Sequence, residues 1–425
     1  MIAPTATVVE SVGQYLEPFA LELKSSDSNN KNNNIDDGED YRSVRTLTDR
    51  SAGDVLLEIP LKDTITVDSI RSRLASCSAQ ERNSEEIVDE EDALAIGLLR
   101  LRDEASDPYV ANVLPKKHYN VWTLPKDLWK ETSAILPRCY SETFDATRQR
   151  VNKFATQIAE AKTHNFSLDD VLWAFSMVRS RSLAVPELAN NDRMLLALIP
   201  GLDLLNHEFG SGTQLQLVES ISESESDSDN ESSSKWVLTS SDSIKAGAEV
   251  FLSYGDEKDN WKLLLTYGFC IPDNPNAVVF FSWGDLLDAV NAVRPDPFSD
   301  KVCKQLLHHP QLEAYTVVSE QRATFSYDMQ TNAPRESLAN GLVMLNSLAA
   351  QLGKPEGDSE ALGQEVLGQL LKRRLKELRD GQSLLQDQHK ALDKKYSEWK
   401  PFFESIKIAL EAEQEQLQKT KHNNE

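Results

Sequence analysis

The chain has 425 residues, enough to build two domains with buried cores, and 40% of its residues are hydrophobic. Acidic side chains number 68 against 45 basic ones, and the net charge of −23 repels phosphate backbones, which excludes nucleic acid as the expected partner. The four cysteines form no Cys-x-x-Cys pair and no apolar run could cross a bilayer, so we expect no metal site, disulfide framework or membrane partner.

The first 34 residues are predicted to form a flexible amino-terminal segment. Its tract KSSDSNNKNNN (24–34) is polar and offers too little apolar surface to fold. The residues before this tract lack the basic and apolar stretches of a secretory signal. The first 20 residues also include acidic residues and no arginine, unlike an organelle transit peptide. We therefore expect an intracellular protein of the cytoplasm or nucleus.

Two short strands and a helix are predicted next in chain order. The segments VLLEIP (55–60) and ITV (65–67) are apolar and β-branched, which predicts two strands joined by a turn at 61–63. From Asp89 to Arg102, leucines recur at steps of four and three, which predicts a helix. A proline at position 108 then interrupts the helical pattern.

A second helix is predicted to begin after Ser167. Ser167 and Asp170, three positions apart, have the pattern of a capping box at a helix start. The segment MLLALIP (194–200) that follows the helix is too short for a buried helix and is predicted to be a strand or turn. The apolar positions of the helix share one face and predict a buried stripe formed by Leu168, Val171, Leu172, Phe175 and Val178.

An acidic, serine-rich loop precedes the next strands. The segment ESISESESDSDNESSSK (219–235) alternates serine with acidic residues and is predicted to be disordered. KWVLTS (235–240) and EVFLSY (249–254) are typical of strands. After residue 274 the pattern favours several amphipathic helices, and Pro401 is predicted to start a new one.

Few residue types in the chain suit familiar hydrolytic or metal chemistry. Asp203, His207 and Ser253 are the residue types of a nucleophilic triad, but Ser253 lies in a predicted strand and not in a Gly-x-Ser-x-Gly turn. His207 has no ligand partner at helical spacing, which argues against a metal. Glycine-rich phosphate loops are absent from the sequence. The remaining hypothesis is a site made of aromatic, amide and backbone groups.

Three segments carry a specific resemblance. LIPGLDLLNH (198–207) resembles the Pro-x-x-Asp-x-x-Asn-His strand of SET-domain protein methyltransferases. FLSYGDEKDNWKLLLTYGF (251–269) is similar to the Tyr–Tyr segment of one subfamily, the Rubisco large-subunit lysine methyltransferase group. WAFSMVRSRSL (173–183) resembles that subfamily's helix ending in Arg-x-Arg, and DPYVANVLP (107–115) its inserted helical region. The resemblance covers roughly residues 40–425.

The resemblance implies S-adenosylmethionine as cofactor and a role for each matching residue. Tyr254 would be the catalytic tyrosine beside the transferring methyl group. Arg181 would bind the amino-acid end of the cofactor, because a guanidinium pairs bidentately with a carboxylate. The other residues that the resemblance implies in cofactor binding are Asn206 and His207 at the ammonium and adenine, Asp203 as a buried cap, Tyr267 and Phe269 at the channel and adenine walls, and Arg45.

Each of these residues also has a purely structural interpretation. Arg181 could be an ordinary cation at a helix end, with Arg179 the stronger candidate for that role. Asn206 and His207 could simply end a strand as a turn. The tyrosines could be ordinary core residues.

The chain departs from the family pattern at its first strand. The family has Gly-x-Gly there, whereas this chain has Tyr-Arg-Ser-Val-Arg-Thr (41–46), whose side chains could crowd a cofactor. No cysteine cluster follows Phe269, so the zinc-binding tail of the histone-type enzymes is absent. Two positions beyond Arg181 stands Leu183, where the actin-histidine methyltransferase has asparagine; this favours lysine over histidine as the methylated residue.

The resemblance implies an α+β fold. A β-rich SET domain (35–274) would carry a helical insertion (about 85–195) and the disordered acidic loop (219–235), followed by an all-α substrate-binding domain (275–425). The implied activity is methyl transfer from S-adenosylmethionine to a lysine of a protein, with a basic or lysine-bearing segment as partner and the enzyme a monomer. Two alternatives stay open: a SET-like protein-binding scaffold with weak or no activity, and a protein-histidine methyltransferase.

Overall fold

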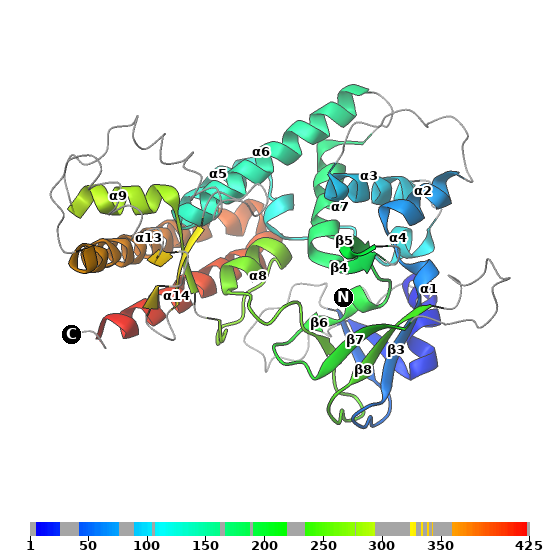
Figure 1. Ribbon diagram of the computed structural model, residues 1–425. Helices are drawn as coiled ribbons and strands as arrows, with labels where there is room; N and C mark the ends of the chain where they lie inside the picture. The colour runs from blue at the N-terminus through cyan, green and yellow to red at the C-terminus, as the bar shows by residue number, and fades with distance from the viewer. Residues whose placement is uncertain are drawn as a thin grey trace. The chain divides into compact units, whose positions relative to one another are not determined.

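The protein is described here by a computed structural model. It divides into two compact units, each built from two stretches of the chain (Figure 1). The first unit comprises Met1–Thr123 and Val151–Glu257, and the second comprises Leu124–Arg150 and Lys258–Glu425. The structure describes residues 6–25, 42–75, 89–103, 107–161, 166–187, 190–218, 234–276, 278–293, 324–328, 333–334, 338–339, 342 and 359–422.

Several sequence predictions fall on residues that the structure does not describe. Most of the polar tract 24–34 and of the acidic loop 219–235 lies outside the described residues. Tyr41, at the start of the segment that lacks glycines, also lies outside them. The proposed domain boundary between residues 274 and 275 stays a prediction.

The strands of the first unit form small antiparallel sheets and one parallel pair. β8 lies between β3 and β7, β1 pairs with β2, and β4 pairs with β5, all antiparallel. The predicted strands at 55–60 and 235–240 are confirmed as β3 and β8, and 194–200 supplies the end of β5. The strands are β1 Leu21–Ser25, β2 Arg42–Thr46, β3 Val55–Pro60, β4 Ser182–Glu187, β5 Asn190–Leu198, β6 Asn206–His207, β7 Thr213–Val218, β8 Lys235–Ser240 and β9 Phe251–Leu252.

The predicted strand at 65–67 is wrong. Ile65 makes only an isolated bridge to Leu198, and helix α2 begins at Val67. The reason is local: the backbone N–H of Thr66 donates to Ser69 Oγ at 2.8 Å, and the backbone N–H of Ser69 donates to Thr66 Oγ1 at 3.1 Å. These reciprocal bonds satisfy backbone donors at a helix start, which overrides the β-branched composition of the segment.

Helices cover the sheets of the first unit, and helix α7 leads directly into β4. The capping box predicted at Ser167 and Asp170 is confirmed. The prediction that Leu168 is buried is wrong, because this side chain lies in the first turn of α7 and is 46% exposed. The other four residues of the predicted stripe are buried. The helices are α1 Ala6–Leu16, α2 Val67–Ala75, α3 Glu90–Asp103, α4 Pro108–Asn112 and α7 Leu168–Arg181, with 3₁₀ turns at Glu17–Phe19, Leu61–Asp63, Val121–Thr123 and Leu202–Leu204.

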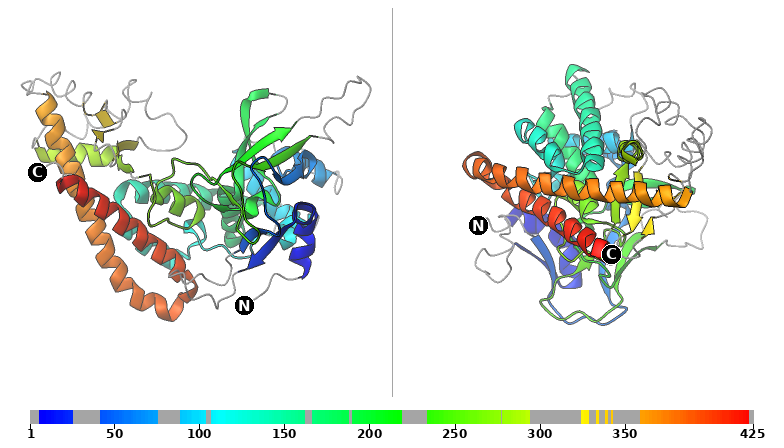
Figure 2. Two further views of the ribbon diagram at one scale, coloured as in Figure 1. Left: turned by 90° about the horizontal axis from the view of Figure 1, so that it is seen from below. Right: turned by 90° about the vertical axis from the view of Figure 1, so that its left-hand side faces the viewer.

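The second unit is mainly helical, as the sequence predicts for the carboxy-terminal half. The long helices α13 and α14 pack side by side (Figure 2), and α14 begins at Lys400, directly before Pro401, as predicted. The unit also holds a three-stranded sheet that an all-α prediction does not include. Its elements are α5 Lys126–Ile135, the start of α6 Arg138–Ala161, α8 Asn260–Tyr267, β10 Val278–Ser282, α9 Trp283–Val293, β11 Thr324–Asp328, β12 Ala333–Pro334, α13 Ser359–Lys395, the 3₁₀ turn Ser397–Trp399 and α14 Lys400–His422.

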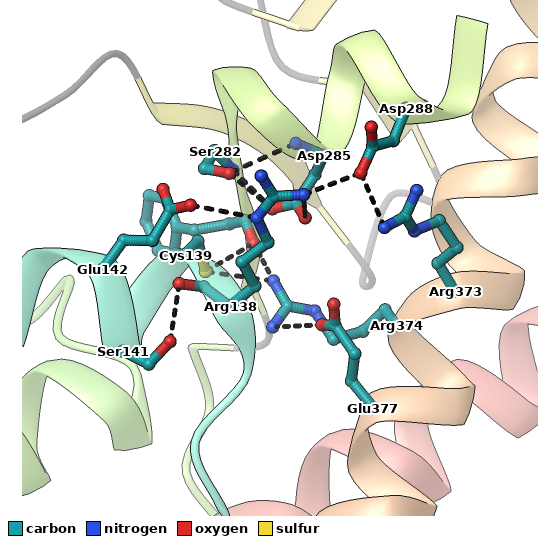
Figure 3. A network of polar contacts seen from close by, with 11 residues as sticks. Arg138, Cys139, Ser141, Glu142, Ser282, Asp285, Asp288, Arg373, Arg374 and Glu377 are labelled. Atoms are coloured by element: carbon teal, nitrogen blue, oxygen red, sulfur yellow. Dashed lines mark hydrogen bonds and ion pairs between the residues drawn. The ribbon is translucent and has the colours of Figure 1, made fainter. Parts of the chain in front are cut away.

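A buried charged network fixes α13 within the second unit (Figure 3). The side chain of Arg374 on α13 is only 1% exposed, and its Nη2 donates to the Phe280 carbonyl of β10 and to Cys139 Sγ of α6. Its Nε lies 3.4 Å from a carboxylate oxygen of Glu413 on α14. Burial removes the water that would solvate this guanidinium, so its stability depends on these partners.

Candidate active site

The Asn206-His207 pair lies beside the segment that leads into Tyr254. β6 and β9 pair in parallel, with Asn206 opposite Phe251 and His207 opposite Leu252. The sequence predicts one apolar strand through His207, but a 3₁₀ turn at Leu202–Leu204 breaks that strand. Gly201 allows the break, because its φ of +87° disfavours any side chain.

Tyr254 is held at both its backbone and its hydroxyl. Its backbone N–H donates to Nδ1 of His207 at 3.1 Å, and its hydroxyl donates to the Leu205 carbonyl at 2.6 Å. The two rings stack with centroids 5.2 Å apart at an angle of 22°. Because Nδ1 of His207 accepts a hydrogen bond, the proton of the neutral imidazole is on Nε2. The tyrosine oxygen keeps its lone pairs as acceptors.

Asn206 is oriented by two acceptors. Its Nδ2 donates to the Arg42 carbonyl at 2.8 Å and to Glu249 Oε1 at 2.7 Å. Both partners are acceptors, which fixes the amide orientation and turns Oδ1 away from them. Glu249 Oε2 also lies 3.7 Å from Nη2 of Arg45. Nη1 of Arg45 in turn donates to the Gly247 carbonyl at 3.0 Å. Glu249 thus links Asn206 to Arg45.

Arg181 pairs with Asp203, which precedes Asn206 by three positions. Its Nη1 donates to the Asp203 carbonyl at 2.8 Å and lies 3.3 Å from Oδ2. The side chain of Asp203 is 1% exposed, and burial raises the pKa of its carboxyl, although the charge of Arg181 opposes this. On the opposite edge of the guanidinium, Nε is buried and has no hydrogen-bond partner among the described residues. That edge has the geometry to take a carboxylate.

Arg179, two positions earlier, has a different environment. Its Nε and Nη2 donate to the two carboxylate oxygens of Glu91 at 2.6 and 3.1 Å. Its guanidinium also lies 4.8 Å from the ring centroids of Trp122 and Phe175. These contacts use the bidentate edge and a face of the guanidinium, so they support the structural role that the sequence favours for Arg179.

A histidine near Arg181 was not identified from the sequence. His118 Nδ1 is 2.7 Å from Ser176 Oγ, which accepts a hydrogen bond from Asn120 Nδ2, also at 2.7 Å. Asn120 Nδ2 also lies 3.2 Å from His118 Nδ1, and because an amide nitrogen can only donate, Nδ1 is an acceptor and the serine hydroxyl donates to it. Burial, together with the charge of Arg181, lowers the pKa of His118 to about 3. The imidazole is neutral, which avoids two adjacent buried cations.

Tyr267 and Phe269 belong to the second unit. Tyr267 ends helix α8, and its ring centroid lies 6.0 Å from that of Phe269. Nζ of Lys258 lies 5.9 Å from the Tyr267 ring centroid. Burial raises the pKa of Tyr267 to about 12, so its hydroxyl stays protonated at neutral pH.

The first unit brings most of the proposed site residues into two connected groups. One group links Tyr254, His207, Asn206 and Arg45 through Glu249 and the β6–β9 pair, and the other links Arg181 to Asp203. Glu249, Tyr109 and His118 were not predicted as site residues. Glu249 opens a predicted strand and Tyr109 lies in the DPYVANVLP match, whereas no pattern in the sequence marks His118.

Among the described residues, no group of three or more His, Cys, Asp or Glu side chains has an arrangement that could hold a metal ion. None of the described helices combines the length and apolar character that crossing a membrane requires.

Comparison with proteins of known structure identifies the fold of this chain. No family model matches the chain. The structure resembles that of the SET domain of LSMT bound to lysine and AdoHcy, with a TM-score of 0.62 and 18% identity over 98% of this chain and 91% of that one. The fold is therefore that of the SET-domain proteins, and the predicted α+β class is confirmed.

Two proteins of known sequence are similar to parts of this chain. SET domain-containing protein 4 of Artemia parthenogenetica is 26% identical over 272 residues, which span 60% of this chain and 61% of that protein. The chloroplastic Rubisco large subunit N-methyltransferase of Pisum sativum is 35% identical over 107 residues, 25% of this chain and 20% of that protein. The chain is similar in sequence to these two proteins, as the resemblance predicts, and its match spans about three-fifths of the length of the first.

Proposed function

We propose that the protein transfers a methyl group from S-adenosylmethionine to a lysine side chain of a protein substrate. The observation that carries this proposal is the attachment of Tyr254 to His207 and to the Leu205 carbonyl, which sets a half-buried tyrosine hydroxyl beside the Asn-His pair. The relatives' names include a protein N-methyltransferase and their structures include a lysine complex. We assign residues 35–274 to the catalytic domain and 275–425 to substrate binding.

The described side chains fit the cofactor. The buried Nε of Arg181 lacks a partner among the described residues and can donate to a carboxylate. Asn206 Oδ1, turned away from its two neighbouring acceptors, can accept a hydrogen bond from an ammonium group. Arg45 is already bonded to the Gly247 carbonyl and close to Glu249, so we propose a supporting role for it at the edge of the site.

Tyr254 helps to align the reacting groups. Its proton is committed to the Leu205 carbonyl at 2.6 Å, so the oxygen can only accept from the reacting groups. When bound, S-adenosylmethionine supplies an electrophilic methyl group on a sulfonium. The tyrosine oxygen can accept weak C–H···O contacts of about 0.5–1 kcal/mol each from such a polarised group. Such contacts help chiefly by holding the acceptor nitrogen in line.

The substrate nitrogen must be neutral to act as a nucleophile. A free lysine has a pKa of about 10.4, and desolvation in a narrow aromatic channel lowers it. We propose Tyr267 and Phe269, whose rings lie near each other at the end of α8, as walls of that channel and of the adenine side. Leu183 of β4 offers no hydrogen bond to an imidazole, which favours lysine over histidine as the methylated residue.

A second candidate function is a SET-like scaffold that binds a protein without methylating it. The observation that favours it is β2, where every position from Arg42 to Thr46 carries a side chain in place of the family's glycines. Against it, Nη1 of Arg42 donates to the Val113 carbonyl at 2.8 Å, so this side chain is anchored directly after α4, and the Arg42 carbonyl accepts a hydrogen bond from Asn206.

The deciding experiment has two stages. Calorimetric titration with S-adenosylmethionine tests cofactor binding, and labelled cofactor incubated with the protein and a cell lysate reveals a methylated band. Mass spectrometry of that band then distinguishes methyl-lysine from methyl-histidine. Absence of cofactor binding would favour the scaffold. We expect a monomer of the cytoplasm or nucleus that acts on a basic or lysine-bearing segment, to which the net charge of −23 is complementary.

A further inference from the structure

Tyr109 lies behind Arg181 and is held on several sides. It stands in α4, whose N-cap Asp107 accepts hydrogen bonds from the Tyr109 and Val110 backbone N–H groups at 2.9 and 3.1 Å. The ring packs edge-on against Tyr15 with centroids 6.4 Å apart, and only 4% of Tyr109 is exposed. The hydroxyl position is therefore set by packing and by the start of the helix.

The Tyr109 hydroxyl connects two parts of the segment that precedes Asn206. It donates to Asp203 Oδ1, 94 positions along the chain, and accepts the backbone N–H of Gly201 at 3.2 Å. Burial and the adjacent Asp203 carboxylate raise the pKa of Tyr109 well above its usual value, so the hydroxyl remains a donor at any working pH. Asp203 thus receives one hydrogen bond from Tyr109 on Oδ1 and faces Arg181 with Oδ2.

Arg181 is the end of this chain of contacts. Asp203 holds Nη1 of the guanidinium through both its carbonyl and Oδ2, which sets the direction of the opposite edge. A guanidinium is planar, so fixing Nη1 also fixes Nε and Nη2. An Asp203 side chain free to rotate would leave Nη1 with the Asp203 carbonyl as its one acceptor on this residue, and the direction of the opposite edge would be less well defined.

We propose that Tyr109 is a positioning residue: through Asp203 it orients Arg181 so that the Nε edge meets the carboxylate of the bound cofactor. This inference rests on the proposed function, since it needs a cofactor with a carboxylate. A purely structural tyrosine would stabilise the fold without distinguishing one ligand from another. A positioning tyrosine changes affinity only for ligands that carry the carboxylate.

The test compares two ligands that differ by that carboxylate alone. S-adenosylmethionine and decarboxylated S-adenosylmethionine are titrated into the wild type and Tyr109→Phe, below the melting temperature of each protein. Tyr15→Phe is the matched control, because it removes the hydroxyl of the neighbouring ring, which lies 3.5 Å from Oδ2 of a different aspartate, Asp63. We expect Tyr109→Phe to weaken S-adenosylmethionine about tenfold and the decarboxylated ligand less than about twofold.

Each other outcome has a distinct meaning. Equal weakening of both ligands, or of neither, overturns the positioning role and leaves the proposed function intact. A wild type that binds neither ligand overturns the proposed function and this inference with it. If Tyr109→Phe does not fold, Asp203→Asn tests the same path, and an equal effect on both ligands overturns the inference.

Discussion

The backbone N–H of Tyr254 donates a hydrogen bond to Nδ1 of His207 at 3.1 Å, across 47 positions of sequence. This bond fixes the loop after β9 relative to β6 and also selects the imidazole tautomer. A residue that replaces His207 and places an acceptor near the position of Nδ1 should therefore preserve the conformation of the loop. A residue whose polar group lies farther from the backbone than Nδ1 should not preserve it.

His207→Asn and His207→Gln test this directly. Asparagine places an acceptor close to the position of Nδ1, whereas glutamine places its polar group near the position of Nε2. We expect His207→Asn to keep more methyl-transfer activity than His207→Gln, and the loss of the hydrogen bond in the glutamine variant to destabilise the fold by about 0.5–1.5 kcal/mol. Turnover and urea unfolding measure the two effects. Equal activity in both variants would contradict the role of Nδ1.

Tyr254→Phe should lower the rate while leaving cofactor binding largely intact. The change removes the hydroxyl that donates to the Leu205 carbonyl and that we propose accepts from the reacting groups. We expect turnover to fall about 100-fold, as for loss of one preorganised polar group in other active sites, and cofactor affinity to change less than about threefold. Single-turnover kinetics and calorimetry measure these quantities. A variant with an unchanged rate would remove Tyr254 from the mechanism.

Arg181 and Arg179 form a matched pair for the cofactor site. Both lie in the last turn of helix α7. Nε and Nη2 of Arg179 donate to the carboxylate of Glu91, whereas Nε of Arg181 lacks a partner among the described residues. Lysine cannot reproduce a bidentate contact. We expect Arg181→Lys to weaken cofactor binding more than about tenfold with little change in melting temperature.

The opposite result is expected for Arg179→Lys. This variant should lower the melting temperature by a few degrees, because it loses contacts with Glu91 and two aromatic rings, and should leave cofactor affinity nearly unchanged. Calorimetry and thermal melts on the same preparations separate the two effects. If both variants lose cofactor affinity equally, Arg181 has no special role at the cofactor.

His118 gives the first unit a pH-dependent stability. Its pKa is about 3 in the folded protein against 6.5 for a free histidine, owing to burial and the charge of Arg181. Between pH 6.5 and about 3, His118 is therefore protonated in the unfolded chain but neutral in the folded protein. The free energy of unfolding falls as pH falls through this range. The slope from this residue is at most about 1.4 kcal/mol per pH unit.

His118→Gln should flatten that slope. Urea unfolding at pH 5.0 and 6.5 measures it, and subtracting the variant from the wild type cancels the carboxylates that titrate in both proteins. We expect the wild type to lose more stability than the variant between these pH values. Parallel losses would show that His118 is not held neutral in the fold.

The network around Arg374 predicts contrasting effects at adjacent positions of α13. Arg374→Met leaves the 5%-exposed side chain of Glu413 buried without its cation and should destabilise the protein by about 3–5 kcal/mol. Arg373→Met, which removes a 39%-exposed side chain paired with Asp288 at 2.8 Å, should change stability by less than about 1 kcal/mol.

A double variant separates burial of charge from loss of packing. Arg374→Met combined with Glu413→Leu removes both charges and should recover most of the stability that Arg374→Met loses. Denaturant unfolding of the full chain measures all of these variants. A double variant no more stable than Arg374→Met alone would contradict the view that the unpaired carboxylate causes the loss.

Local patterns predicted much of the fold. Features that depend on neighbouring residues were predicted and are confirmed: the capping box at Ser167 and Asp170, the strands at 55–60 and 235–240, and the helix start at Pro401. The prediction at 65–67 is wrong because composition alone could not reveal the reciprocal bonds of Thr66 and Ser69 that begin a helix. The sheet β10–β11–β12 was missed because its strands are short and interrupt a strongly helical pattern.

The sequence by itself predicted the fold class, which is confirmed, and named the residues that we propose for catalysis and binding, because motif residues are recognised by type and spacing. Only the tertiary structure decided how they are held: Tyr254 by His207, Asn206 by Glu249, and Arg181 by Asp203 with Tyr109 behind it. These contacts join residues up to 94 positions apart. Periodicity and capping report on neighbouring residues, whereas a buried polar contact between distant segments depends on how the whole chain closes around it.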